Sequence, residues 1–228
     1  MIDFMQFRKN RAMRPDPQVE ISEASFTVLD TELTGLDERK DSLVSVGAVR
    51  MTGGRVDLGR SFYKLINPEA KLTESSVVIH RITPGEVCEK PPVSSVLSDL
   101  MDFIESDILV GFCISIDMEF LNRDAKRCLG RLIRNNVLDI KPLYEWAIGR
   151  EERKNGTAVT VPPRYRLYDI AKHYGIEMSN AHNAIMDAFV TAQIFQRFIP
   201  VFAGAGITRV GDLMKLSDRL KGGDRFTA

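Results

Sequence analysis

The chain has 228 residues, of which 44% are apolar and 27% charged, and its 31 Lys plus Arg balance 31 Asp plus Glu. This length favours one α/β domain with short extensions, and the apolar fraction allows a sizeable core. Because the formal net charge is zero, a net electric field is excluded as the basis of nucleic-acid binding. Such binding would have to rest on local basic clusters or on bound cations.

The cysteines and the N-terminus indicate an intracellular setting. Cys88, Cys113 and Cys128 lack the spacing of a metal clip or a redox pair, and their odd number favours reduced thiols. The first residues contain no apolar run long enough for a signal peptide, and no segment is apolar enough to span a bilayer. We therefore expect a cytoplasmic protein without a membrane partner.

The first part of the chain has the pattern of a short arm followed by hairpins. Residues 1–20 are basic and contain prolines, so we expect an arm or a short helix outside the core. Apolar, β-branched runs predict strands at 25–30, 43–51 and 60–66, with a turn at 52–54. The short connections favour antiparallel pairing of these strands.

The rest of the chain alternates between helix and strand patterns. Tight hairpins followed by alternating strands and helices predict a mixed five-stranded sheet flanked by helices, the outline of a ribonuclease-H-like α/β fold. We expect this domain to cover 21–198 and a C-terminal tail to cover 199–228. In chain order the expected elements are a helix at 93–106, a strand at 107–112, a helix at 116–133, a strand at 137–140, a short helix near 141–149, a charged loop at 149–164, helices at 165–174 and 183–198, and a weakly amphipathic helix at 208–220.

An acidic pair closes the first expected strand. Asp30 and Glu32 are two residues apart, so their side chains point to the same side of an extended chain. Two carboxylates beside a buried strand repel each other unless a cation lies between them, and Mg²⁺ prefers such oxygen ligands. On its own, such a pair is more often only an acidic strand end, so further acids are needed to indicate a site.

Further candidates lie at two expected helix starts. Asp117 follows the strand at 107–112, in a first helical turn, where the helix dipole favours an acid without any function. His182 and Asp187 would lie about 140° apart on one continuous helix. They can share a site only if His182 lies in the preceding loop and Asn183 caps the helix. A lone histidine is more often structural, so the hypothesis depends on the whole set of residues.

The order of these segments resembles the DEDDh exonucleases, the DnaQ-like family of proofreading subunits and ribonuclease T. The similarity extends over residues 24–198 and includes the segments DTELTG, LVGF…ID and HNAIMDA, together with IHRIT (79–83) and DIAKHYGI (169–176). The family has a ribonuclease-H-like fold and hydrolyses nucleic acids from the 3′ end.

The resemblance implies a role for each acidic candidate and for the histidine. Asp30, Glu32, Asp117 and Asp187 are expected to bind two Mg²⁺ or Mn²⁺ ions, and His182 to accept a proton from the attacking water. Two ions about 3.5–4 Å apart generate a hydroxide and stabilise the leaving 3′ oxygen. An imidazole with an ordinary pKa of about 6.5 suits a proton acceptor at neutral pH.

The chain departs from the family pattern at four positions near these segments. Many members have His-Asn where this chain has Phe112-Cys113, Phe where it has Ile116, and Gly where it has Arg81. None of these differences removes an expected metal ligand. They concern the shape of the nucleotide pocket and hence the preferred substrate.

Candidate substrate contacts fall into three groups. The resemblance suggests that the backbone of Leu33 and Thr34 seats the terminal nucleotide and that His80 lines the same cleft, although a structural role for His80 stays open. An arginine stripe on the helix at 116–133 and just beyond it could follow a phosphate backbone, although a solvated helix face is the simpler interpretation. The charged loop at 149–164 could also border the site. These basic residues are Arg123, Arg127, Arg131 and Arg134 in the stripe, and Arg150, Arg153, Lys154 and Arg164 in the loop.

We therefore expect a metal-dependent 3′–5′ exonuclease that acts on single-stranded nucleic acid and releases nucleoside 5′-monophosphates. Proofreading or repair of DNA is slightly favoured over RNA trimming, and no residue is identified that would read a 2′-hydroxyl. The alternatives are an exoribonuclease, a non-catalytic polymerase-associated nucleic-acid-binding module on the same fold, and an interaction domain that docks through 199–228. A DNA polymerase is a candidate partner, and the sequence does not indicate an oligomeric state.

Overall fold

A mixed sheet of five strands forms the centre of the computed structural model, which describes residues 15–155, 165–178 and 182–223. The strands are β1 (Ser25–Leu33), β2 (Leu43–Thr52), β3 (Arg55–Leu65), β4 (Ile108–Gly111) and β5 (Val137–Asp139). They lie in the order β3-β2-β1-β4-β5. β1, β2 and β3 pair in antiparallel fashion, whereas β4 is parallel to both β1 and β5. The predicted ribonuclease-H-like fold class is confirmed.

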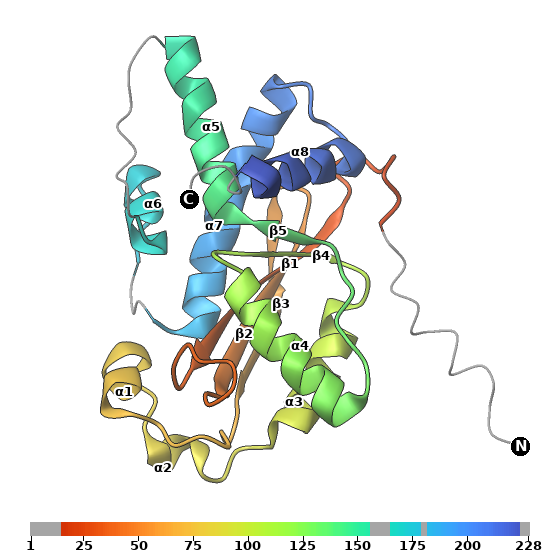
Figure 1. Ribbon diagram of the computed structural model, residues 1–228. Coiled ribbons are helices and arrows are strands. Elements are labelled where there is room, and N and C mark those ends of the chain that lie inside the picture. Colours follow the sequence, from red (N-terminus) through yellow and green to blue (C-terminus); the bar gives the residue numbers. More distant parts are fainter. Residues whose placement is uncertain (1–14, 156–164, 179–181, 224–228) are drawn as a thin grey trace, which may run out of the picture.

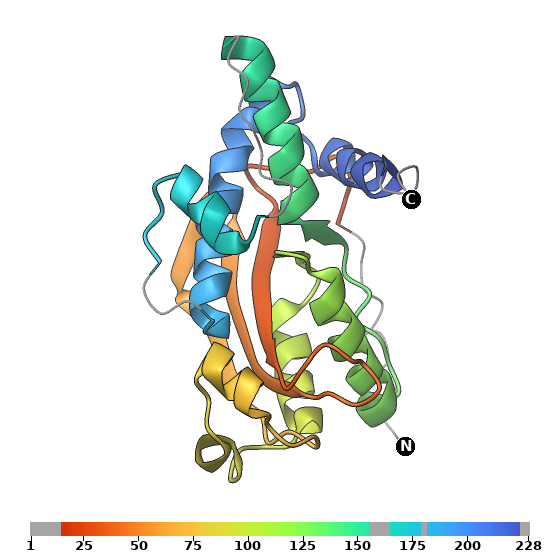
Figure 2. The same cartoon turned by 60° about the vertical axis from the view of Figure 1, so that its left-hand side comes forward.

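Helices cover both faces of this sheet (Figure 1, Figure 2). They are α1 (Glu74–His80), α2 (Pro84–Val87), α3 (Val93–Ile104), α4 (Ser115–Leu129), α5 (Ile140–Asn155), α6 (Leu167–His173), α7 (Ala184–Gly204) and α8 (Val210–Gly223). α7 runs along one face together with α5, α6 and α8, and α3 and α4 pack on the other face. Within the described ranges, no helix combines the length and the apolar character that a membrane-spanning segment requires.

The alternation of side chains along β1 assigns each residue to one of these two faces. Phe26 and Val28 are fully buried in the core beneath α7, where the ring of Phe26 packs edge-on against that of Phe195. Leu29 is buried in the core beneath α3 and α4. Because successive residues of a strand point to opposite faces, the even-numbered positions of β1 face α7.

Two helices, α5 and α7, are longer than the pattern indicates. The expectation of a loop at 149–164 is wrong for its first part, because α5 continues to Asn155; residues 156–164 lie outside the described residues. α7 continues through Pro200 to Gly204, past the predicted end at 198. Phe198 and Phe202 are both fully buried and four residues apart, so the apolar face of α7 does not stop at the proline.

The short helix α1 was not indicated by the sequence pattern. It has seven residues, and its β-branched and polar residues show no helical repeat of apolar positions. A capping box begins it, in which the Thr73 hydroxyl accepts the Ser76 N–H at 3.1 Å and the Ser76 hydroxyl accepts the Thr73 N–H at 3.2 Å. Arg81 ends it in the left-handed conformation with φ of 60°. This conformation favours glycine, which explains the glycine of many family members at this position as a helix cap.

The N-terminal end of the described chain lies against the beginning of α8. The Val210 N–H donates to the Val19 carbonyl and the Gly211 N–H to the Pro17 carbonyl, each at 2.9 Å. The described part of the expected N-terminal arm is therefore attached to the beginning of α8, and residues 1–14 lie outside the described residues. The predicted C-terminal helix is confirmed, and its buried Leu213 belongs to the core beneath α7.

Candidate active site

The first acidic pair lies at the end of β1 and faces α7. The two-residue repeat that buries Phe26 and Val28 continues to Asp30 and Glu32, so these carboxylates are on the same side of the sheet. Asp187 in the first turn of α7 meets them there. One carboxylate oxygen from each of Asp30, Glu32 and Asp187 lies within 4.8 Å of the other two.

The beginning of α7 has the geometry that the sequence required of it. Asn183 is the N-cap, and its side-chain oxygen accepts the Met186 N–H at 3.4 Å. His182 precedes the helix in the left-handed conformation with φ of 64°, and its backbone N–H donates to Asp187 Oδ2 at 3.2 Å. The side chain of His182 is exposed. His182 and Asp187 therefore lie close together, although they are five residues apart.

Gly47 allows α7 to approach the sheet at this point. It pairs with Asp30 across the β1–β2 ladder. A Cβ atom on Gly47 would lie 2.2 Å from the backbone nitrogen of Ile185 and 2.5 Å from the carbonyl oxygen of Ala184. The backbone of α7 thus rests directly on β2, which brings Asp187 over the end of β1. Sequence reasoning missed Gly47, although a lone glycine within a β-branched strand often marks such a close approach.

We predict that Gly47→Ala displaces the start of α7. Overpacking of this kind lowers the free energy of unfolding by about 1–3 kcal/mol, and a shift of about 1 Å in a catalytic group lowers a rate by up to about 10²-fold. Gly54→Ala is the matched control, since its methyl group would lie at an ordinary 3.6 Å from Ile199 Cδ1. Chemical denaturation and a hydrolysis assay measure both quantities. Equal behaviour of the two variants would contradict this role of Gly47.

The acidic cluster is strongly biased toward its protonated form. Burial, followed by the charges of Asp187 and Asp117, raises the pKa of Glu32 to about 8. Burial and then the charges of Asp117, Glu32 and Asp187 hold the pKa of Asp30 well above its ordinary value. Burial also raises the pKa of Asp187, whereas the nearby His182 lowers it. Carboxylates in this state are stabilised in their charged form by a cation.

Asp117 reaches the site from the opposite face of the sheet. It lies in the first turn of α4 and its Oδ1 accepts the Thr31 hydroxyl at 2.5 Å. Burial raises its pKa to about 7, against the hydrogen bond from Thr31. Its carboxylate is outside the group of three oxygen atoms described above, but its charge is the second cause of the raised pKa of Asp30. The structure therefore brings all four predicted acids together, with three of them closest.

The donor set fits a divalent metal ion. Three carboxylate oxygens converge on one point, and Asp187 Oδ1 is buried without a hydrogen-bond partner among the described residues. Oxygen ligands of this type are those that Mg²⁺ and Mn²⁺ take in proteins. A bound cation would satisfy Asp187 Oδ1 and offset the burial and the mutual repulsion that raise the pKa values of Asp30 and Glu32.

The predicted substrate contacts have different environments. The Thr34 hydroxyl donates to Asp41 Oδ1 at 2.9 Å and accepts the Ser42 N–H at 3.0 Å, so the Thr34 side chain is engaged within its own loop. His80 is only 4% exposed, and its Nδ1 accepts the Ile82 N–H at 3.0 Å. This contact supports the structural role left open for His80. Its Nε2 has no hydrogen-bond partner in the described part of the chain, so a substrate contact by His80 stays a prediction.

One departure from the family pattern near Asp117, Cys113, has an unusual backbone conformation. Cys113 adopts the left-handed conformation with φ of 53°, and its N–H donates to Asp139 Oδ1 at 3.0 Å. Asparagine tolerates this conformation better than cysteine, which accounts for the asparagine of many family members. Burial and the charge of Asp139 raise the pKa of the Cys113 thiol to about 11, so it is not a thiolate near neutral pH.

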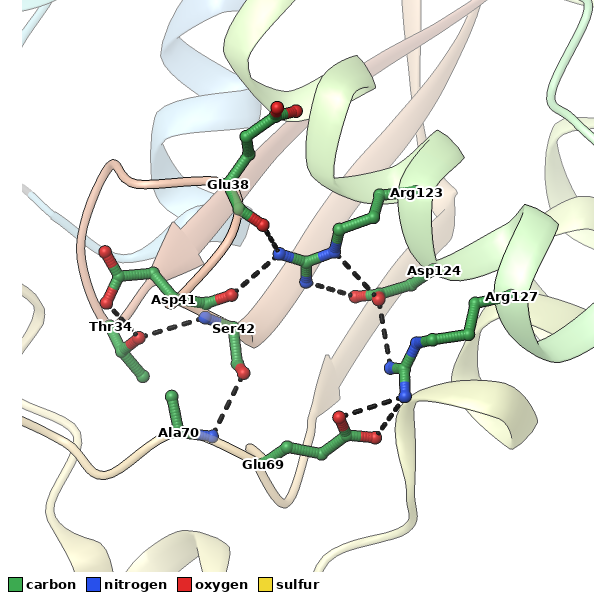
Figure 3. Close-up of polar contacts among 9 residues, drawn as sticks. All are labelled: Thr34, Glu38, Asp41, Ser42, Glu69, Ala70, Arg123, Asp124 and Arg127. Carbon is green, nitrogen blue, oxygen red and sulfur yellow. Dashed lines mark hydrogen bonds and ion pairs between the residues drawn. The ribbon is translucent and has the colours of Figure 1, made fainter.

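The arginine stripe on α4 and just beyond it agrees only in part with a solvated helix face. Arg134 is exposed. The side chain of Arg123 is 28% exposed and that of Arg127 is 47% exposed. Both form ion pairs with the buried Asp124, and Arg127 also pairs with Glu69 (Figure 3). Arg150, which was expected in the loop at 149–164, lies in α5. Its Cζ is 5.3 Å from the centroid of the Trp146 ring.

Comparison with known proteins identifies the family. Residues 27–195 match the model of the RNase_T family, which is described as Exonuclease. The chain belongs to this DnaQ-like exonuclease family. The match covers β1 to α7 and includes the four acids and His182. Members of this exonuclease family depend on divalent metal ions, in agreement with the donor set at the end of β1.

Relatives of this exonuclease domain include DNA polymerase III proteins. It is 29% identical to the DNA polymerase III subunit epsilon of Aquifex aeolicus over 78% of this chain and 81% of the relative. It is also 29% identical to the PolC-type DNA polymerase III of Thermotoga maritima, over 87% of this chain and 14% of that protein. The chain therefore spans only about a seventh of the PolC-type relatives that it matches.

Solved structures share the fold of this exonuclease domain. E. coli exonuclease I in complex with a dT13 oligonucleotide superimposes with a TM-score of 0.67 at 20% identity, over 80% of this chain and 42% of that one. Exonuclease X in complex with 5′ overhanging duplex DNA superimposes with a TM-score of 0.57 at 19% identity, over 86% of this chain and 99% of that one.

Proposed function

We propose that this exonuclease domain removes nucleotides from the 3′ end of single-stranded DNA in a reaction that depends on two divalent metal ions. The observation that carries the proposal is the convergence of Asp30, Glu32 and Asp187 within 4.8 Å, with Asp117 beside them. A protein that only binds nucleic acid has no use for clustered carboxylates, which repel phosphates. The products would be nucleoside 5′-monophosphates.

The residues of the site would have separate roles in hydrolysis. Asp30, Glu32, Asp117 and Asp187 would hold the ions, which when bound supply an activated water and charge stabilisation at the leaving oxygen. His182 would accept the proton of that water. Its backbone N–H is tied to Asp187 Oδ2 while its side chain is exposed beside the acids, so the imidazole can reach a water at the edge of the cluster.

The preference for DNA is supported by the relatives and neighbours. The two relatives above are named as DNA polymerase III proteins, and exonuclease I is bound to a deoxyoligonucleotide. Trimming of RNA is the second candidate. A DNA polymerase is the partner that the named relatives suggest for this chain. Copurification with a polymerase can be measured for wild type and for Asp187→Asn. A protein that copurifies with a polymerase but does not hydrolyse DNA would have a binding role rather than a catalytic one.

Direction and metal dependence are tested with a labelled strand. A single-stranded DNA with a 5′ label should yield a ladder of shortening products with Mg²⁺ or Mn²⁺ and none with EDTA. A bulky linkage next to the 3′ end should stop the reaction. Early release of the 5′ label as a mononucleotide would contradict the proposal. Matched RNA and duplex DNA in the same assay measure the substrate preference.

A further inference from the structure

The loop that follows the first two acids is anchored to α4 by one arginine. Arg123 Nη1 donates to the backbone carbonyls of Glu38 and Asp41, the latter at 2.8 Å (Figure 3). These carbonyls belong to the connection between β1 and β2, which the chain reaches more than eighty residues earlier. The guanidinium also lies over the ring of Phe120, with its Cζ 4.9 Å from the ring centroid.

A buried carboxylate holds Arg123 in this orientation. The side chain of Asp124 is only 2% exposed. It accepts Arg123 Nε at 3.0 Å and Nη2 at 2.8 Å, and it accepts Arg127 Nη2 at 3.0 Å. The two-pronged pairing with Asp124 leaves Nη1 directed at the loop. Only the planar guanidinium can make both sets of contacts at once, and a lysine ammonium cannot.

Hydrogen bonds within the loop connect the Arg123 contacts to the residues beside the acids. Asp41, whose carbonyl Arg123 binds, accepts the Thr34 hydroxyl at 2.9 Å, and the Thr34 N–H donates to the Ser42 carbonyl at 3.0 Å. Thr34 comes two residues after Glu32. A Cβ atom on Gly35 would lie 2.4 Å from Asp41 Oδ2, so the loop is closely packed on itself.

From these contacts we infer that Arg123 is a positioning residue for substrate binding. It holds the loop from Leu33 to Ser42 and thereby the backbone of Leu33 and Thr34 beside the acids. This inference rests on the proposed function. The positions of Asp30 and Glu32 do not depend on Arg123, because the β1–β2 ladder holds both residues. Loss of Arg123 should therefore weaken the seating of the terminal nucleotide and leave metal binding intact.

The test compares Arg123→Gln and Arg123→Lys with Arg127→Gln. Arg127→Gln is the matched control, because the hydrogen bonds of Arg127 go to Asp124 and Glu69 and not to the backbone of residues 34–41. Each full-length variant is measured for KM and kcat on a single-stranded DNA oligonucleotide. The other measurements are oligonucleotide binding by fluorescence anisotropy, the rise in melting temperature on adding Mn²⁺, and amide exchange at residues 35–41.

For Arg123→Gln we expect KM and the oligonucleotide Kd to rise about ten- to a hundredfold, as for a misplaced binding element, with a smaller change in kcat. Amide exchange at residues 35–41 should accelerate, and the Mn²⁺-induced rise in melting temperature should match that of wild type. Arg123→Lys should restore part of the affinity. Arg127→Gln should lower the melting temperature without these changes in KM and exchange.

Two results would overturn the inference. One is an unchanged oligonucleotide Kd and unchanged exchange at residues 35–41 in Arg123→Gln. The other is an equal loss of affinity in Arg127→Gln, which would assign the effect to the general stability of α4. If wild type does not hydrolyse DNA, the proposed function fails, and the anisotropy and exchange measurements still decide the role of Arg123.

Discussion

Replacing Asp187 with asparagine should raise the melting temperature of the metal-free protein near pH 8 and abolish hydrolysis. The variant removes the charge that contributes most, after burial, to the raised pKa of Glu32. An asparagine oxygen can still accept the His182 N–H that Asp187 Oδ2 accepts. The native contacts of this side chain therefore survive, whereas a metal ligand is lost. Binding of single-stranded DNA should largely remain.

The sign of this effect follows from the direction of the pKa shifts. Glu32 has an ordinary pKa of 4.5 when the chain is unfolded and about 8 in the folded protein, so the folded state binds more protons between these values. Its contribution to stability is fully present below about pH 4.5 and is lost as the pH rises through about 8. The metal-free wild type should therefore lose stability over this window. The loss of stability between pH 4.5 and about 8 should be smaller in Asp187→Asn than in wild type.

Metal ions should restore the stability of wild type at high pH but should not stabilise Asp187→Asn to the same extent. A ligand that binds only the folded state stabilises it by about 2.7 kcal/mol at a hundred times its Kd. Thermal melts with EDTA, Mg²⁺ or Mn²⁺ measure this increase. Asp30→Asn should behave like Asp187→Asn. The control is Asp102→Asn, an exposed acid on α3, which should change stability by less than about 0.5 kcal/mol. Equal metal-induced increases in all these proteins would refute the assignment of the site.

Replacing His182 with alanine should lower the rate of hydrolysis by about 10²–10⁴-fold, the usual contribution of a general base. The metal-induced rise in melting temperature should persist, because the group of three converging oxygens does not include His182. In wild type, the rate should fall as the solution is acidified, since a protonated imidazole cannot accept a proton. This acidic limb of the pH–rate profile should weaken in the variant. Steady-state rates at saturating metal and substrate test both statements.

The backbone of His182 calls for a second variant. With φ of 64°, this position costs alanine stability. Asparagine tolerates the left-handed conformation and also lacks a basic group near neutral pH, so His182→Asn separates loss of the base from strain at the start of α7. The two variants should lose activity to a similar extent. An unchanged rate in His182→Asn would place the base elsewhere.

The sequence by itself determined the strands and the chemical nature of the candidate site. Alternation along β1 placed Asp30 and Glu32 on one side of the strand, and the capping preference of Asn183 placed His182 outside α7. Both are local rules that act over a few residues. They need no knowledge of distant neighbours, and the structure confirms both.

Only the tertiary structure decided how distant segments meet. Thr31 binds Asp117 across 86 residues of sequence, and Arg123 binds the Asp41 carbonyl across 82. An arginine on a helix has the same local pattern whether it faces solvent, phosphate or a buried carboxylate, so its role could not be predicted from its spacing. The contact of α7 with Gly47 likewise exists only because packing brings two backbones together, and periodicity does not encode that approach.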